Sequence, residues 1–111
     1  MNARRREVRW THVAESDLLE IIVRIAQDRP LAAEEILTRI RRKAESLPEL
    51  SERGGVVPEL GRLGTKEYRE ILLAPWRILY RIRPKRIEIV AVLDSRRNIE
   101  DLLLQRLTRP R

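Results

Sequence analysis

Two segments with helical periodicity, separated by only three residues, constrain the fold of this chain more than any other feature. The first starts at Ser16 and places its apolar residues at helical spacing: Leu18, Ile21, Ile22 and Ile25. Residues 28–30 interrupt this pattern, and Pro30 suits the first position of a second helix. That helix keeps one apolar stripe: Ala33, Ile36, Leu37, Ile40, Ala44 and Leu47. So short a connection predicts an antiparallel helical hairpin whose apolar stripes pack against each other and against a sheet.

Three strand-like runs in the second half predict this sheet as an antiparallel meander. They occupy residues 68–73, 76–82 and 87–93. A turn at Pro84 and Lys85 would set these pairs: Arg81 with Glu88, Tyr80 with Ile89, Ile78 with Ala91 and Trp76 with Leu93. The face that meets the helices then carries Trp76, Ile78, Tyr80 and Ile82. The opposite face carries Arg77, Leu79 and Arg81, a mixed surface for solvent or a partner to cover, and a slip of one residue would exchange the two faces.

The remaining segments complete an α+β domain. A short strand over residues 8–13 precedes the hairpin, and residues 48–66 form a long, glycine-rich loop that Val56, Val57 and Leu60 hold against the body. Asn98 caps a last helix with these apolar residues: Ile99, Leu102, Leu103 and Leu107. The prediction is one domain over residues 1–111, frayed at 1–7 and 108–111. Its order is N-terminal strand, antiparallel two-helix hairpin, three-stranded antiparallel meander and C-terminal helix.

The composition argues against several classes of function. The 111 residues include no cysteine and one histidine, so we expect neither disulfides nor a metal site. His12 falls in the first predicted strand among apolar residues, where a structural role is expected. The glycines lack the strand-to-helix context of phosphate-binding loops, which predicts no nucleotide cofactor. The basic residues 1–9 lack the apolar stretch of a signal peptide and no run is long enough to span a bilayer, so we expect a cytoplasmic protein without membrane contacts.

The positive charge of the chain is carried mostly by arginine. The formal net charge is +7, which suits an acidic protein partner or a nucleic acid. One set of arginines falls near strand ends and loops of the second half: Arg62, Arg69, Arg77, Arg96 and Arg97. These side chains could form one basic surface, with Tyr68 as the aromatic residue most suited to exposure, or they could be ordinary solvated charges. Composition alone leaves both interpretations open.

The order of elements and several short motifs resemble the RelE/ParE superfamily of toxins from type II toxin-antitoxin systems, and the ParE branch in particular. The resemblance covers about residues 8–107 and rests on these motifs: Val57-Pro58-Glu59-Leu60-Gly61, Tyr68-Arg69-Glu70-Ile71, Trp76-Arg77-Ile78-Leu79-Tyr80-Arg81 and Arg96-Arg97-Asn98. Each motif is short, but their order within one small domain makes the signal specific.

The resemblance leaves two activities to compare. RelE-like members are ribosome-dependent ribonucleases that cut messenger RNA without a metal, and Arg77 and Arg96 match their phosphate-binding arginines while Arg69 matches a basic position. Ile71 and Leu102 stand where that branch would have a second basic residue and a tyrosine. An arginine is a poor general base, so this set would bind phosphate without cutting efficiently. ParE-like members inhibit DNA gyrase and need no catalytic residue of their own.

Three functional hypotheses follow. The first is a ParE-like toxin that inhibits growth by blocking gyrase, in a system of the plasmid-stabilisation type; it would not be an enzyme. The second is a RelE-like messenger ribonuclease, for which Arg69, Arg77 and Arg96 are the candidate catalytic residues, and the third is a basic nucleic-acid-binding module.

The resemblance also implies a cognate antitoxin that forms a hetero-oligomer with the toxin. We expect the antitoxin to have a DNA-binding first half and an acidic second half. The second half would cover the apolar groove between hairpin and sheet, together with these residues: Tyr68, Arg77, Arg81 and Arg97.

Overall fold

A five-stranded sheet organises the computed structural model, which describes residues 6–50 and 54–108. The strands are β1 (Glu7–Trp10), β2 (Gly55–Val56), β3 (Tyr68–Leu73), β4 (Trp76–Ile82) and β5 (Arg86–Asp94). Their order across the sheet is β1-β5-β4-β3-β2. β1 runs parallel to β5 and every other neighbouring pair is antiparallel, so the predicted α+β class and meander are confirmed.

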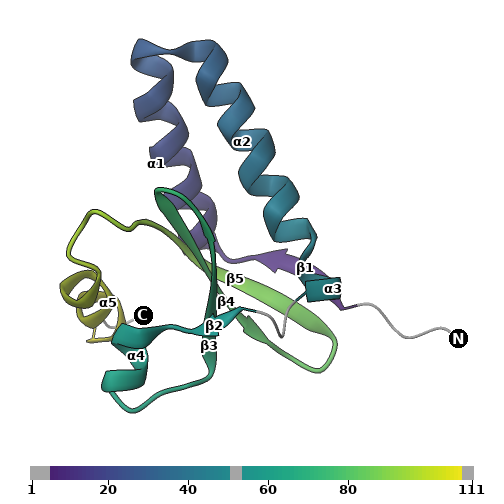
Figure 1. Ribbon diagram of the computed structural model, residues 1–111, viewed down its shortest axis with the longest axis vertical. Coiled ribbons are helices and arrows are strands. Elements are labelled where there is room, and N and C mark those ends of the chain that lie inside the picture. The colour runs from purple at the N-terminus through teal and green to yellow at the C-terminus, as the bar shows by residue number, and fades with distance from the viewer. Residues whose placement is uncertain (1–5, 51–53, 109–111) are drawn as a thin grey trace, which may run out of the picture.

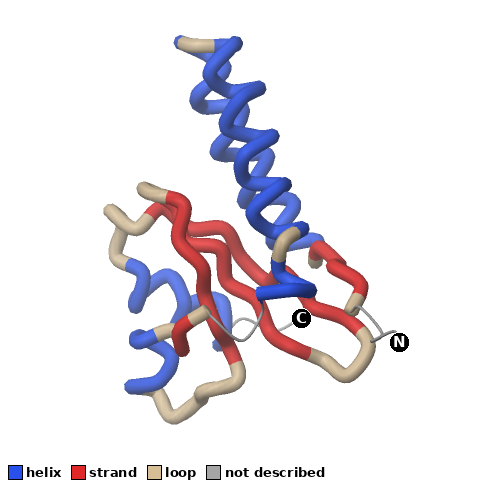
Figure 2. The backbone as a smooth tube through the Cα atoms, turned by 45° about the vertical axis from the view of Figure 1, so that its right-hand side comes forward, coloured by secondary structure: helices blue, strands red, loops and turns tan. Residues whose placement is uncertain are grey.

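The helical hairpin is also confirmed. α1 (His12–Asp28) and α2 (Pro30–Glu45) are separated by Arg29 alone, and Pro30 is the first residue of α2. The two helices lie side by side and project from one side of the sheet (Figures 1 and 2). α1 starts earlier than Ser16, because the Thr11 hydroxyl accepts a hydrogen bond from the Ala14 amide (3.2 Å) and caps the helix.

This cap corrects the prediction for the first strand. The strand expected over residues 8–13 ends at Trp10, and His12 is the exposed first residue of α1 instead of a strand residue. The beginning of the chain is also more ordered than expected: Arg6 Nε donates to the Arg83 carbonyl (3.0 Å) and the Glu7 amide donates to the Lys85 carbonyl (3.2 Å). The rest of the predicted N-terminal fraying, at residues 1–5, lies outside the described residues.

The segment 48–66 is not a plain loop. It contributes to α3 (Leu47–Leu50), β2 and α4 (Pro58–Arg62). Val57 and Leu60 are buried, as predicted, whereas Val56 is 39% exposed because its side chain projects from the short edge strand β2. Regular hydrogen bonding therefore satisfies much of the backbone in a stretch whose glycines and prolines indicated a loop.

The predicted register between β4 and β5 holds for one half of the pair. Arg81 pairs with Glu88 and Tyr80 with Ile89, as predicted. A bulge between Leu79 and Tyr80 then shifts the register, so that Leu79 pairs with Ala91 and the expected partners of Ile78 and Trp76 are displaced by one residue to Val92 and Asp94.

Two apolar clusters sit on opposite faces of the sheet. The first packs the hairpin against one face and includes Leu18, Ile40, Trp76, Ile78 and Tyr80, so the predicted inner face is correct. The second lies under α4 and the C-terminal helix α5 (Ile99–Thr108) and includes Val57, Leu60, Leu79, Leu93 and Leu103. Figure 1 shows α4 and α5 on the side of the sheet away from the hairpin.

The second cluster corrects the expectation of an uncovered outer face. Leu79 is only 1% exposed, because α4 and α5 of the same chain cover it. The predicted cap of α5 is confirmed, since Asn98 Oδ1 accepts a hydrogen bond from the Asp101 amide (3.1 Å). α5 ends at Thr108, and residues 109–111 of the predicted frayed end lie outside the described residues.

Candidate functional site

The arginines singled out from the sequence do not form one basic surface. Arg77, on β4, is 8% exposed and lies between two carboxylates. Its Nε donates to Glu70 Oε1 (2.7 Å), and its two terminal nitrogens donate to the Glu59 carboxylate (2.8 and 2.6 Å). The hydrogen bond from Arg77 lowers the pKa of Glu59, and the same bond raises the pKa of Arg77. Arg77 therefore ties α4 and β3 to β4 and is not available on a partner-binding surface, contrary to the expectation.

Glu59 and Glu70 were not recognised as functional residues from the sequence. Glu70 lies diagonally across from Arg77, because Leu72 is the direct partner of Arg77 in the β3–β4 register. That diagonal could have been read from the predicted meander. Glu59 could not, because it belongs to a helix inside the segment expected to be a loop.

Arg69 points to the face of the sheet opposite Arg77. Its Nη1 donates to the carbonyl of Gly54 (2.7 Å), and it is paired in the register with Tyr80, which is fully buried in the hairpin-side cluster. Burial raises the pKa of Tyr80, although the charge of Arg69 acts in the opposite direction. The three candidate catalytic residues Arg69, Arg77 and Arg96 are therefore not assembled around one point.

Arg96 is exposed but is held by the neighbouring acid. Its Nε and Nη2 donate to the two oxygens of Asp94 (2.9 and 2.6 Å), and this hydrogen bonding lowers the pKa of Asp94 to about 2. Arg97 follows on the exposed loop between β5 and α5, and its amide donates to the Asp94 carbonyl (3.1 Å). The positive charge of Arg97 also favours the ionised form of Asp94.

A group of half-buried arginines does gather at the open end of the outer face, beyond α4 and α5. We call it the arginine platform, and it consists of these residues: Tyr68, Arg81, Arg83, Arg86 and Glu88. Glu88 is 8% exposed and accepts hydrogen bonds from Arg81 Nε (2.7 Å) and Arg86 Nε (2.8 Å), while Arg83 Nε lies 3.7 Å away. These hydrogen bonds, that from Arg81 first, lower the pKa of Glu88 to about 2.

The platform keeps positive charge and carries an aromatic ring. Arg81 lies over the Tyr68 ring at 5.7 Å from its centroid, and Glu67 reaches Arg81 at 3.5 Å. Three guanidinium groups therefore face two carboxylates. Arg81 and Tyr68 lie together here as candidate partner-binding residues, whereas Arg97 lies on a separate loop. Arg83 and Arg86 were missed, although the predicted pairing of Arg81 with Glu88 placed both of them close to that acid.

Among residues 6–50 and 54–108, no helix is long and apolar enough to cross a membrane.

Comparison with known proteins identifies the family. A family model described as the ParE toxin of the type II toxin-antitoxin system parDE matches residues 8–99. Toxin RelE2 of Caulobacter vibrioides is 35% identical over 92 residues, which cover 82% of this chain and 97% of that protein. A solved structure titled "Chromosomal ParDE TA system from P. aeruginosa" has the same fold, with a TM-score of 0.69 and 20% identity over 83% of this chain and 98% of the other. The chain therefore belongs to the ParE toxin family of type II toxin-antitoxin systems.

Proposed function

We propose that this toxin blocks DNA gyrase in the cytoplasm through protein contacts and that a cognate antitoxin neutralises it. One observation carries the choice over RNA cleavage: the arginines that would bind a scissile phosphate are already engaged by the protein's own groups. Arg77 is held by two carboxylates and Arg96 by Asp94. A phosphate would have to displace a carboxylate from each of these arginines before it could bind.

The positions expected to transfer protons also favour inhibition by binding. Metal-independent RNA cleavage needs a group that takes a proton from the ribose hydroxyl and one that protonates the leaving oxygen. Ile71 packs against the hairpin-side cluster and Leu102 against the outer cluster, so both positions serve the core. Arginine stays protonated at neutral pH and cannot replace the missing base.

We place the acidic part of the antitoxin on the arginine platform. The platform combines partly exposed positive charge with the Tyr68 ring, a pairing that suits an acidic segment carrying apolar anchors. Of the expected partner-binding residues, Arg81 and Tyr68 belong to the platform, and Arg83 and Arg86 are added to them. Arg97 would contact the antitoxin only if the antitoxin chain continues toward α5.

Two assays run side by side test the proposed activity. Toxin freed from antitoxin is added to gyrase with relaxed plasmid, and separately to ribosomes translating a reporter message. We expect loss of supercoiling or accumulation of cleaved DNA, an intact message, and reversal of the gyrase effect when antitoxin is added first. Normal supercoiling at excess toxin would overturn the gyrase proposal, and ribosome-dependent cuts in the message would replace it with the ribonuclease hypothesis.

A further inference from the structure

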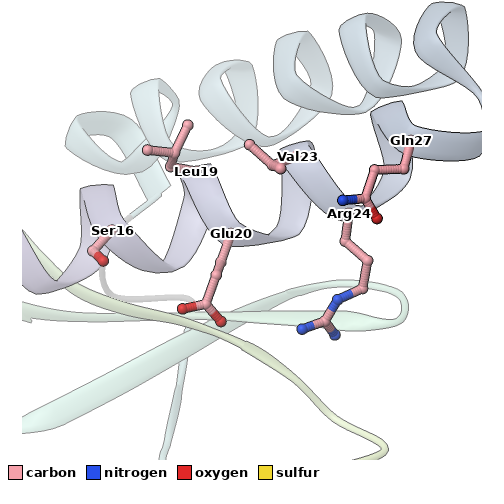
Figure 3. Close-up of a pocket in the computed structure, with 6 residues that line it drawn as sticks. All are labelled: Ser16, Leu19, Glu20, Val23, Arg24 and Gln27. Atoms are coloured by element: carbon pink, nitrogen blue, oxygen red, sulfur yellow. The ribbon is translucent and has the colours of Figure 1, made fainter.

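The outward side of α1 exposes apolar side chains that nothing in the described chain covers. Leu19 is 64% exposed and Val23 is 49% exposed, and both belong to a shallow groove that we call the α1 face. The α1 face consists of these residues: Ser16, Leu19, Glu20, Val23, Arg24 and Gln27. All six are exposed and come from one helix, which projects from the body (Figures 1 and 3).

The side chains of the α1 face divide into two flanks. Figure 3 shows Leu19 and Val23 on one side of the helix, and Glu20 and Arg24 on the other side, directed toward the sheet. Glu20 and Arg24 form no ion pair with any residue in 6–50 or 54–108. The face thus presents one apolar flank and one flank with an acid and a base that pair with no side chain of the described residues.

We propose that the α1 face pairs with the α1 face of a second copy, with the two helices antiparallel about a two-fold axis. In such a pair each flank meets the same flank of its partner. Leu19 then meets Val23 of the other copy, and Glu20 meets Arg24. A parallel pair would bring the apolar flank of one copy against the charged flank of the other and would lose both sets of contacts.

The ends of the face fit the same arrangement. Ser16 and Gln27 lie at opposite ends, and an antiparallel pair centred between Leu19 and Arg24 places the Ser16 hydroxyl near the Gln27 amide of the partner. The polar residues at the two ends of the face therefore meet across the pair.

The charges of the α1 face favour a second copy over an acidic peptide. The face carries one acid and one base, so it has no net charge to attract an acidic segment, unlike the arginine platform. The net charge of +7 makes two copies repel each other at a distance, and one helix face buries less area than the roughly 1,200–2,000 Å² of a stable complex. We therefore expect a weak, concentration-dependent dimer, independent of the gyrase proposal.

A charge swap measured by sedimentation equilibrium tests the pairing. Glu20→Arg and Arg24→Glu should each weaken dimerisation about tenfold, because each variant places like charges opposite each other twice. The double variant Glu20→Arg/Arg24→Glu should restore the wild-type constant. The matched swap on α2, Glu35→Arg/Arg39→Glu, has the same spacing on an exposed surface where Leu31 is the one apolar residue of the groove, and it should change nothing.

The two single variants separate local pairing from overall repulsion. Glu20→Arg raises the net charge and Arg24→Glu lowers it, so repulsion alone would make the second variant dimerise more strongly than the wild type. That result, or a wild-type chain that stays monomeric up to millimolar concentration, would overturn the proposal.

Cysteine cross-linking tests the antiparallel geometry, since the chain has no cysteine of its own. At a rise of about 1.5 Å per residue, two copies of position 23 lie close to the proposed axis, whereas two copies of position 16 lie about 16 Å apart along the helices. Val23→Cys should form disulfide-linked dimers. Ser16→Cys and Gln27→Cys should cross-link only when mixed, and efficient linkage of Ser16→Cys with itself would show a parallel pair and contradict the proposal.

Discussion

The contacts of Arg77 give it a structural role instead of a binding role. It lies among carboxylates from two elements, at 2.6–2.8 Å from Glu59 and Glu70. We expect Arg77→Ala to lower the free energy of unfolding by about 3 kcal/mol, because it leaves two half-buried carboxylates without their partner. Urea denaturation followed by circular dichroism measures this loss.

The exposed pair between Arg62 and Glu100 provides the control for Arg77. Its side chains are 62% and 47% exposed at a separation of 3.3 Å. Arg62→Ala should therefore change the unfolding free energy by no more than about 0.5 kcal/mol. Equal losses for the two arginine variants would show that Arg77 does not hold α4 to the sheet.

Gly54 and Gly55 are adjacent but tolerate side chains differently. A Cβ at Gly54 would collide with the Tyr80 hydroxyl and lie 2.8 Å from the Glu70 carbonyl, whereas a Cβ at Gly55 would meet nothing within 4 Å. Gly54→Ala should therefore lower the melting temperature by several degrees and Gly55→Ala should leave it nearly unchanged. Differential scanning calorimetry of the two variants makes the comparison, and similar melting temperatures would contradict it.

Glu88 should make the free energy of unfolding depend on pH in the acidic range. Its pKa in the folded protein is about 2, below the ordinary value of 4.5, so the unfolded chain takes up the proton first as the pH falls. The stabilisation from Glu88 is complete above about pH 4.5 and is lost as the pH falls toward 2. Glu88→Gln should be less stable than wild type at pH 7 but should lose less stability between pH 4.5 and 2. Parallel pH profiles of the two proteins, from denaturation at each pH, would rule out this contribution.

At the scale of elements, Asp17 joins three segments that lie far apart in the sequence. Its carboxylate, on α1, accepts the Val92 amide of β5 (3.0 Å) and two hydrogen bonds from Arg106 of α5 (2.9 and 2.7 Å). We expect Asp17→Asn to weaken the attachment of α5, because a neutral amide cannot accept both bonds from the guanidinium. Amide hydrogen exchange should then speed up in α5 more than in α2.

The control for Asp17 is Glu100→Gln, which removes a charge from α5 itself in an exposed pair. It should leave the exchange rates of α5 close to those of the wild type. Unchanged exchange in Asp17→Asn would mean that apolar contacts alone hold α5 in place.

Local patterns predicted most elements, but not the contacts between distant ones. The hairpin and the meander follow from periodicity and from Pro30, which act over a few residues. The bulge between β4 and β5 could not be predicted, because Val90, Ala91 and Val92 are all apolar and give no alternation that would mark the extra residue. The burial of Leu79 also depends on where α4 and α5 pack, which no local sequence pattern predicts.

The candidate site was predictable to the same extent. The cross-strand pair of Arg81 and Glu88 followed from the turn, so the centre of the arginine platform was visible in the sequence. The burial of Arg77 could not be predicted, because the sequence around an arginine on a strand is the same whether its side chain is solvated or bound to a glutamate far away in the chain.

At the scale of the whole molecule, the net charge of +7 should govern how fast the antitoxin arrives. Surface charges act over about 30 Å at 0.01 M salt and about 8 Å at 0.15 M. The association rate should therefore fall as salt rises, and Arg83→Ala should slow association mainly at low salt. Stopped-flow mixing with labelled antitoxin measures both effects.

Arg39→Ala is the matched control, since it removes the same charge from the exposed side of α2, away from the platform. It should slow association less than Arg83→Ala does. An association rate of the wild-type pair that does not change with ionic strength would exclude steering by charge.

The parallel pairing of β1 with β5 affects how the protein can be made. Thr11 donates its hydroxyl hydrogen to the carbonyl of Ile89, 78 positions later. During translation, the α1–α2 hairpin can form from local contacts, but the sheet that covers its apolar stripe is completed only when β5 has left the exit tunnel. The apolar stripe of the hairpin in a nascent toxin is therefore exposed for most of its synthesis, and the complete sheet forms only at the end.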